Sequence, residues 1–176
     1  MKKTTTIRST TIATNAGPFR MLASEEGVLA SGFTDDPERL RALLTSEERD
    51  LPTLEVDDLG AWSDAVRAYF AGDVGAISTV PVIQPSAPFT AAARDEMRAI
   101  RVGRTLTYTE LAAAAGRPDA PRAAGAACAG NRTALFVPCH RVVRTDGTLG
   151  GYLWGLPVKR WLLEFERQAA EARTAA

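Results

Sequence analysis

Histidine and cysteine are scarce in this sequence of 176 residues, which contains one histidine and two cysteines. Two cysteines do not make a disulfide framework, so we expect a reduced, cytoplasmic protein. A structural zinc site would need acidic ligands beside so few soft ones, and no spacing in the chain provides them. We therefore expect no metal and no other cofactor.

Long apolar stretches are also missing. No run approaches the roughly 20 apolar residues that a membrane-spanning helix needs. The segment 1–15 has two lysines but lacks the apolar run of a secretory signal. We expect no association with a membrane, although a hydrophobic content of 45% is sufficient for the core of one domain or of two small ones.

Charges balance over the whole chain but are unevenly distributed along it. Residues 1–88 hold 8 Lys/Arg and 13 Asp/Glu, whereas residues 89–160 hold 11 Lys/Arg and 5 Asp/Glu. An arginine-rich segment of this kind is a mild indication of a polyanionic partner such as DNA. Ordinary solvated surfaces carry such an excess too, so the charge alone does not decide the partner.

The first half of the sequence alternates between strand-like and helix-like patterns. Apolar and β-branched runs at 5–12, 19–23 and 28–33 are separated by turn residues, which predicts a small antiparallel sheet. Segments 36–44 and 59–71 are helix-prone, and the second has clear amphipathic spacing. We interpret residues 1–80 as an αβ domain.

A proline-rich stretch at 81–88 is interpreted as a linker, because three prolines within it do not suit a helix. The pattern after it is helical, starting with a predicted helix over 89–100. We expect a second, mostly helical domain over 89–170 and a disordered tail over 171–176. The fold class predicted for the whole chain is α+β.

Two short helices are predicted in the middle of the second domain. Thr107 and Glu110 have the spacing of a capping box, and Gly116 has the position of a helix exit. The next helix, over 119–130, is rich in alanine and has Asp119 as its expected N-cap. This pair suggests a helix-turn-helix, although alanine-rich helix pairs are also common packing units.

The chain's one histidine, His140, directly follows Cys139 in the run FVPCHRVV. A thiol is mostly protonated at neutral pH, and a nearby base raises its thiolate fraction. Neighbouring side chains of an extended segment point to opposite faces, so we expect His140 to act on Cys139 through a water molecule. The alternative is that Cys139 is simply a small buried hydrophobe, as we expect for Cys128.

The run Pro138-Cys139-His140-Arg141-Val142 resembles the active-site signature of the O6-alkylguanine-DNA alkyltransferases. The chain is most similar to bacterial members, which share the Tyr-X-Trp-Gly run found at 152–155. Other matches follow the family's order over 89–166: Thr107-Tyr108, Arg122 to Gly125, Gly130-Asn131, Gly147, Gly150-Gly151, Lys159, Leu162-Leu163 and Glu166. The resemblance implies an RNase H-like first domain and a winged-helix-like second domain that carries Cys139.

The resemblance also implies a suicide DNA repair protein. Such a protein flips O6-alkylguanine, chiefly O6-methylguanine with O4-methylthymine as a further candidate, out of duplex DNA. It then transfers the alkyl group irreversibly to Cys139 by in-line displacement. In this mechanism a water links Cys139 to His140, Glu166 orients the imidazole, and Asn131 ties the helix-turn-helix to the active-site loop.

Further residues are expected, by the same resemblance, to contact DNA from its minor groove. Arg122 would fill the gap left by the flipped base, and Tyr108 would push the 3′ phosphate aside. Small neighbours would let the helix approach the sugar-phosphate walls: Ala123, Ala124 and Gly125. We expect a monomer and leave open whether it binds DNA cooperatively.

The base itself is expected to meet a second group of residues. Tyr152 would donate to the guanine, and the carbonyls of Cys139 and Val142 would read its edge. Trp154 stands where some relatives have glycine and should favour methyl over benzyl adducts. Arg132 replaces a proline that is usual in the family, and its charge could contact a phosphate.

Ordinary structural roles remain open for several of these residues. Tyr108 could be a core aromatic, Glu166 a solvated carboxylate and Arg122 a surface charge, while Arg141 is expected to form structural ion pairs. Two other functions also remain. One is a lesion sensor that binds alkylguanine without transferring the group, and the other is a cysteine hydrolase, which would need an oxyanion hole and turnover.

Overall fold

The computed structural model describes residues 6–175 and divides the chain into two compact units, Met1–Gln84 and Pro85–Ala176. The boundary falls inside the expected linker, but that linker is shorter than the sequence suggested. The Pro81 carbonyl accepts from the Val28 amide at 2.9 Å, and the Ile83 amide donates to the Val28 carbonyl at 2.8 Å. These bonds assign residues 81–83 to the first unit. Pro81 can take part in the pairing because proline lacks a backbone N–H but its carbonyl still accepts a hydrogen bond.

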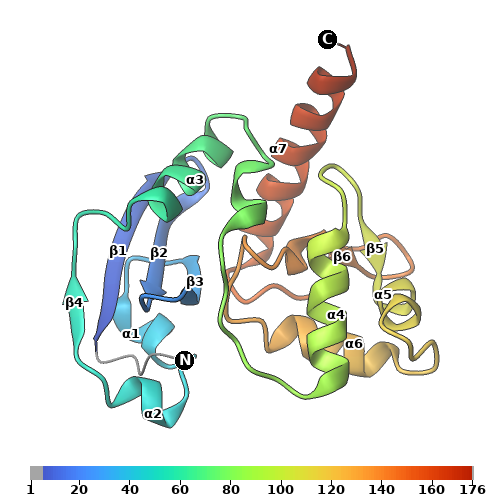
Figure 1. The fold of residues 1–176 in the computed structure, drawn as a ribbon. Coiled ribbons are helices and arrows are strands. Elements are labelled where there is room, and N and C mark those ends of the chain that lie inside the picture. Colours follow the sequence, from blue (N-terminus) through green and yellow to red (C-terminus); the bar gives the residue numbers. More distant parts are fainter. Residues whose placement is uncertain (1–5, 176) are drawn as a thin grey trace. The chain divides into compact units, whose positions relative to one another are not determined.

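The first unit contains a four-stranded sheet in the order β3-β2-β1-β4 (Figure 1). Its strands are β1 (Ile7–Thr14), β2 (Gly17–Ala23), β3 (Val28–Phe33) and β4 (Thr53–Glu55). The first three strands pair antiparallel, as predicted, but β4 pairs parallel to β1. The sheet is therefore mixed and not purely antiparallel. The connection through 34–52 supplies the crossover that a parallel pairing requires.

The described part of the first unit contains four helical segments, and the third of them packs on the sheet through an aromatic side chain. These segments are α1 (Pro37–Arg41), α2 (Ser46–Arg49), α3 (Ala61–Phe70) and the 3₁₀ turn η1 (Ala76–Thr79). The Phe33 ring lies 5.0 Å from the Phe19 ring and 6.4 Å from the Phe70 ring, edge to face in both cases. Tyr69 of α3 is fully buried. The amphipathic pattern over 59–71 thus gives the helix that it predicted, and its apolar side chains enter the core.

The second unit is mostly helical (Figure 1). Its elements are α4 (Pro88–Ala99), β5 (Leu106–Thr107), α5 (Tyr108–Ala114), α6 (Pro121–Ala129), the 3₁₀ turn η2 (Cys139–Arg141), β6 (Val142–Val143) and α7 (Leu156–Ala175). The two short strands pair in parallel. Helices α4, α5 and α6 pack on one another and form the predicted helix-turn-helix region. No helix within residues 6–175 is long and apolar enough to cross a bilayer.

The start of α5 confirms the predicted capping box. The Thr107 hydroxyl accepts from the Glu110 amide at 3.1 Å, and the Glu110 carboxylate accepts from the Thr107 amide at 2.7 Å. The prediction for α6 was wrong in one detail, because its N-cap is Ala120 and not Asp119. Pro121 occupies the first turn, where its fixed φ favours the helix and its missing N–H costs nothing.

Helix α7 continues through Ala175, so the expected disordered tail is helical as far as the structure describes it. Arg167 forms ion pairs with Glu164 at 2.6 Å and with Glu171 at 2.5 Å, one on each side of it. Pairs at these spacings stabilise the last turns of a helix. Ala176 lies outside the described residues.

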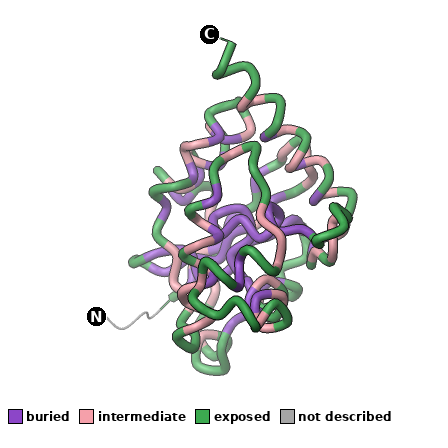
Figure 2. The backbone as a smooth tube through the Cα atoms, turned by 90° about the vertical axis from the view of Figure 1, so that its right-hand side faces the viewer, coloured by how far each residue is buried: buried purple, intermediate pink, exposed green. Residues whose placement is uncertain are grey.

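A buried loop precedes β6. Every residue from 131 to 143 is buried, and Figure 2 colours the backbone by this property. Leu135, in the middle of the loop, has a φ of +73° and is completely buried. A left-handed conformation costs a non-glycine residue about 1–2 kcal/mol. Burial of the Leu135 side chain and the Val137-to-Thr133 hydrogen bond of 3.0 Å hold it in place.

We predict that Gly103→Ala destabilises the fold more than Gly147→Ala. Both glycines have a left-handed φ, +74° and +80°, so both substitutions carry the same strain of about 1–2 kcal/mol. A Cβ at Gly103 would also lie 2.7 Å from the Ala170 Cβ of α7, whereas one at Gly147 meets nothing within 4 Å. Overpacking should cost about 1–3 kcal/mol more at Gly103. Equal free energies of unfolding in urea for the two variants would contradict this.

Candidate active site

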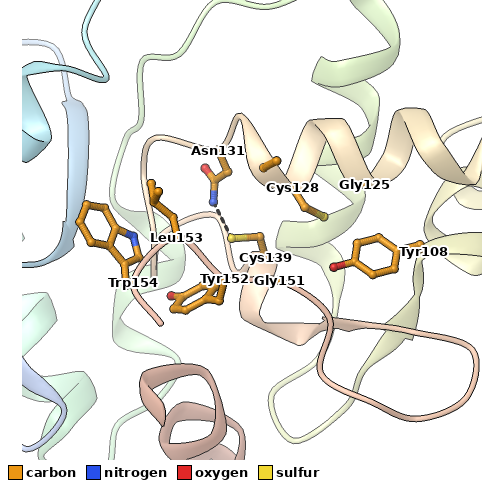
Figure 3. A pocket seen from close by; sticks show the side chains of 10 residues that line it. Tyr108, Gly125, Cys128, Asn131, Cys139, Gly151, Tyr152, Leu153 and Trp154 are labelled. Atoms are coloured by element: carbon orange, nitrogen blue, oxygen red, sulfur yellow. Dashed lines mark hydrogen bonds between the residues drawn. The ribbon is translucent and has the colours of Figure 1, made fainter. Parts of the chain in front are cut away.

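The Cys139 thiol lies at the start of η2 and lines a cavity of about 280 Å³ (Figure 3). Tyr108 and Trp154 stand on opposite sides of Cys139 in this cavity. The other lining residues are Gly125, Cys128, Ala129, Asn131, Gly151, Tyr152 and Leu153. All of them belong to the second unit. Cys139 is thus buried, with 9% of its surface exposed, but next to space for a small group.

Asn131 fixes the position of this thiol. Its Nδ2 donates to the Cys139 Sγ at 3.1 Å (Figure 3) and also to the Val137 carbonyl at 2.7 Å. Its Oδ1 accepts from the Thr133 amide at 3.1 Å, and its own amide donates to the Cys128 carbonyl at 3.1 Å. Asn131 therefore connects the end of α6, the buried loop and the sulfur.

His140 faces α7, where it meets Glu166. Its Nε2 lies 2.9 Å from Glu166 Oε1, and both side chains are completely buried. Arg141 grips the same carboxylate with two bonds of 2.8 Å and donates to the Ile100 carbonyl at 2.7 Å. The solvated alternative for Glu166 is therefore wrong, and Arg141 forms the structural ion pair that was expected of it.

The charge state of this cluster follows from its contacts. Burial by itself would raise the pKa of Glu166, but His140 and Arg141 outweigh it and hold that pKa below its ordinary value. Burial lowers the pKa of His140 more than Glu166 raises it, so the imidazole is neutral. An ionised Glu166 can only accept, which puts the imidazole hydrogen on Nε2 and leaves Nδ1 with a free lone pair.

His140 Nδ1 is buried and has no hydrogen-bond partner within the described residues. The expected extended backbone is instead a 3₁₀ turn over Cys139–Arg141, which turns the His140 Nε2 toward α7. A buried acceptor of this kind is normally satisfied, often by an ordered water. His140 is therefore a neutral base that directly follows Cys139 in the sequence. Its basic atom, Nδ1, is still available to accept a proton.

Burial raises the pKa of the Cys139 thiol, while the Asn131 hydrogen bond and the Lys159 charge oppose this effect. Lys159 is itself completely buried. Its ammonium donates to the Val142 carbonyl at 2.6 Å, to the Gly151 carbonyl at 3.3 Å and to the Leu149 carbonyl. Lys159 was expected only as a match to the family pattern, without a role. A lysine so deeply buried needs several acceptors, and one of those found here, the carbonyl of Gly151, belongs to a residue that lines the cavity.

The Tyr152 hydroxyl is another buried group without a hydrogen-bond partner among residues 6–175. Its ring meets the His140 ring edge to face at 6.5 Å. Burial raises the pKa of Tyr152 well above its ordinary value, so the phenol stays neutral and can donate. A buried hydroxyl without a hydrogen-bond partner lowers the stability of the fold. Such a group is typical of a binding site, where a ligand supplies the missing partner.

Tyr108 lies on the side of Cys139 opposite Trp154 (Figure 3). It is half-buried and is therefore not a core aromatic. A Cβ at Gly150 would lie 2.7 Å from the Tyr108 hydroxyl, and one at Gly125 would lie 3.9 Å from its ring. Gly150 must therefore remain glycine for Tyr108 to keep this position. Arg122 is exposed on α6, beside the half-buried Ala123.

Two expected DNA contacts are not supported by the burial of the residues concerned. Ala124 is completely buried, because its place on α6 faces the helical core and not solvent. Arg132 is only 9% exposed, because it follows Asn131 into the buried loop. Val142 is also buried, and its carbonyl accepts from Lys159. Cys128 and Leu153 also line the cavity, although no local pattern in the sequence distinguishes either residue from its neighbours.

The sequence is similar to that of a known methyltransferase. A methylated-DNA–protein-cysteine methyltransferase of Shigella flexneri is 37% identical over 158 residues, which cover 88% of this chain and 92% of that protein. The chain belongs to the methylated-DNA–protein-cysteine methyltransferase family. Residues 88–168 also match the family model of the 6-O-methylguanine DNA methyltransferase DNA-binding domain.

Solved structures of family members have the same fold. The crystal structure of the Mycobacterium tuberculosis O6-methylguanine methyltransferase has a TM-score of 0.74 and 28% identity, covering 93% of this chain and 94% of that one. The M. tuberculosis OGT protein in complex with DNA has a TM-score of 0.77 and 27% identity, covering 92% of this chain and 94% of that one. The methyltransferase fold thus extends over both units.

We predict that Glu166→Gln lowers the free energy of unfolding at pH 7 by about 3–5 kcal/mol, because it leaves the buried Arg141 without its counter-charge. The folded state lowers the pKa of Glu166, so its stabilisation is present above the ordinary glutamate pKa of about 4.3 and is lost as the pH falls through the folded value. The difference between wild type and variant should therefore shrink in acid.

Glu164→Gln is the matched control for this measurement. Glu164 is exposed on the same helix and pairs with Arg167 at the surface, where ion pairs contribute little. Urea unfolding between pH 3 and pH 8 should show a small change for this variant. Equal losses in the two variants at pH 7 would contradict the central place of Glu166.

Proposed function

We propose that the protein repairs O6-alkylguanine in duplex DNA, chiefly O6-methylguanine, by moving the alkyl group irreversibly to Cys139, once per molecule. The observation that carries the proposal is the Cys139 thiol at the cavity, held by Asn131 at 3.1 Å beside a histidine whose Nδ1 has no partner within residues 6–175. Membership of the methyltransferase family supports it. O4-methylthymine presents a similar alkyl ether and is proposed as a minor substrate.

The chemical step needs a thiolate, a base and a leaving group. A water between Cys139 and His140 would pass the thiol proton to Nδ1, and Glu166 would stabilise the imidazolium that forms. The sulfur then attacks the methyl carbon in line, so that the S–C bond forms as the C–O6 bond breaks. The guanine anion takes up a proton, and the net change converts the thiol and the methyl ether into a thioether and guanine.

The second unit has the parts that this reaction would need to handle DNA. An alkyl group on O6 cannot reach a buried sulfur while the base stays stacked, so the nucleotide must be flipped out. We propose that α6 enters the minor groove, where the exposed Arg122 replaces the missing base and Ala123 and Gly125 permit close approach. Tyr108, at the cavity, would displace the 3′ phosphate.

The base would be recognised inside the cavity. The Tyr152 hydroxyl, which is buried and has no hydrogen-bond partner among the described residues, would donate to the guanine. The cost of keeping this hydroxyl unsatisfied is recovered only when a base supplies the acceptor. Carbonyls of Cys139 and Val142 would accept from the base edge, since a carbonyl oxygen has two lone pairs and Lys159 uses one of those on Val142. A monomer contains every group in this scheme.

We predict that the protein takes one methyl per molecule from a duplex whose O6-methylguanine carries a radioactive methyl. Cys139→Ser should take none, because a serine hydroxyl is far less acidic than a thiol. Cys128→Ser is the matched control and should keep the stoichiometry of one, whatever its rate. Burial raises the pKa of Cys128 well above its ordinary value, so it is a poor nucleophile in the same cavity.

The same measurement separates the other functions. Tight binding of the lesion without label on the protein would identify a sensor, and release of label into solution with turnover would identify a hydrolase. Label that persists in Cys139→Ser would place the acceptor elsewhere and contradict the proposal.

We predict that the protein reacts faster with O6-methylguanine than with O6-benzylguanine in DNA. Trp154 lines the cavity and is only 8% exposed, so its ring takes space that a benzyl group would need. Trp154→Gly should raise the ratio of benzyl to methyl rates, and the methyl rate of each variant serves as its internal control. Comparable rates for the two adducts in the wild-type protein would show that Trp154 does not limit adduct size.

A further inference from the structure

Residues 144–151 form an exposed turn after β6, which we call the wing. The Arg144 amide donates to the Thr148 carbonyl at 2.9 Å, and the Gly147 amide donates to the Arg144 carbonyl at 3.0 Å. Asp146 accepts from the Thr148 amide at 2.9 Å and from its hydroxyl at 2.7 Å. These bonds hold the wing in one conformation although solvent surrounds it.

The wing is attached to the cavity at its far end. Lys159 binds the carbonyls of Leu149 and Gly151, so the last residues of the wing cannot move away from the cavity wall. Gly150 has a left-handed φ of +69° and lies so close to Tyr108 that a Cβ there would be 2.7 Å from the hydroxyl. The wing and Tyr108 therefore form one surface beside the cavity mouth.

Arg144 is the cation that this surface presents to solvent. It is exposed, and its side chain makes no hydrogen bond or ion pair with any described residue. The nearby cations are used inside the protein: Arg141 binds Glu166, and Lys159 binds backbone carbonyls. The carboxylate of Asp146, the acid of the wing, accepts from Thr148, and these bonds together with the charge of Arg144 lower the pKa of Asp146.

Strand pairing places Arg144 near Tyr108, because the two residues directly follow Val143 of β6 and Thr107 of β5, which pair with each other. Burial raises the pKa of the Tyr108 hydroxyl, and the charge of Arg144 acts in the opposite direction. The guanidinium is thus within electrostatic reach of the tyrosine that would meet the backbone of the flipped nucleotide. A DNA strand whose flipped base enters the cavity must carry its phosphates past this surface.

We propose that Arg144 binds a DNA backbone phosphate next to the flipped nucleotide and so helps to hold the strand in its distorted path. The inference rests on the proposed function. A guanidinium suits this role because its planar fork can bind two phosphate oxygens at once. Arg144 acts on DNA binding and not on the sulfur, so it is a positioning residue that should leave the chemical step alone.

The test measures affinity for a duplex containing O6-methylguanine over a range of salt concentrations. Arg144→Ala should weaken binding about tenfold at low salt. It should also reduce the slope of log K against log salt by about one, since one phosphate contact is lost. Arg144→Lys should retain the slope. Arg173→Ala removes an exposed arginine from the end of α7, away from α5 and α6 (Figure 1), and should leave the slope unchanged.

Methyl transfer from free O6-methylguanine base is the second readout, because a base without phosphates cannot use Arg144. Arg144→Ala should react with the free base at the wild-type rate. A slope equal to that of the wild type, or an equal loss of rate with free base and DNA, would overturn the inference while leaving the alkyl transfer intact. A wild-type protein that accepts no methyl, combined with a reduced slope in Arg144→Ala, would refute the proposed function and leave the phosphate contact standing.

Discussion

One buried carboxylate, that of Glu166, organises the second unit. It accepts from His140 at 2.9 Å and from Arg141 through two bonds of 2.8 Å, and Arg141 in turn binds the Ile100 carbonyl after α4. A buried ion contributes only when its partners satisfy it, and here the same bonds hold η2 against α7. The tautomer of His140 depends on this carboxylate, whereas Asn131 holds the Cys139 thiol.

The site separates the tasks of holding the thiol and activating it. Asn131 and Lys159 oppose the effect of burial on the pKa of Cys139, but burial still dominates, so the resting sulfur is a protonated and unreactive thiol. His140 is neutral, and its Nδ1 has no hydrogen-bond partner in the part of the chain that the structure describes. Such an arrangement suits a nucleophile that must not be consumed before its substrate is bound, because it reacts only once.

Local patterns in the sequence predicted local structure well. The Thr107 capping box, the amphipathic helix over 59–71 and the Cys139-His140 pair all follow from neighbouring residues. Features set by distant contacts could not be predicted from neighbours. The parallel pairing of β4, the burial of Ala124 and Arg132, and the three carbonyls around Lys159 depend on segments that meet only after folding.

Helix α7 supplies both Lys159 and Glu166, although Cys139 precedes it in the chain. During synthesis, a nascent chain that has been made only as far as β6 already contains the thiol but lacks the carboxylate that orients its base and the ammonium that shapes its cavity. The order of translation therefore delays assembly of the reactive centre until α7 has folded onto η2. A ribosome-bound intermediate would carry Cys139 as an ordinary cysteine.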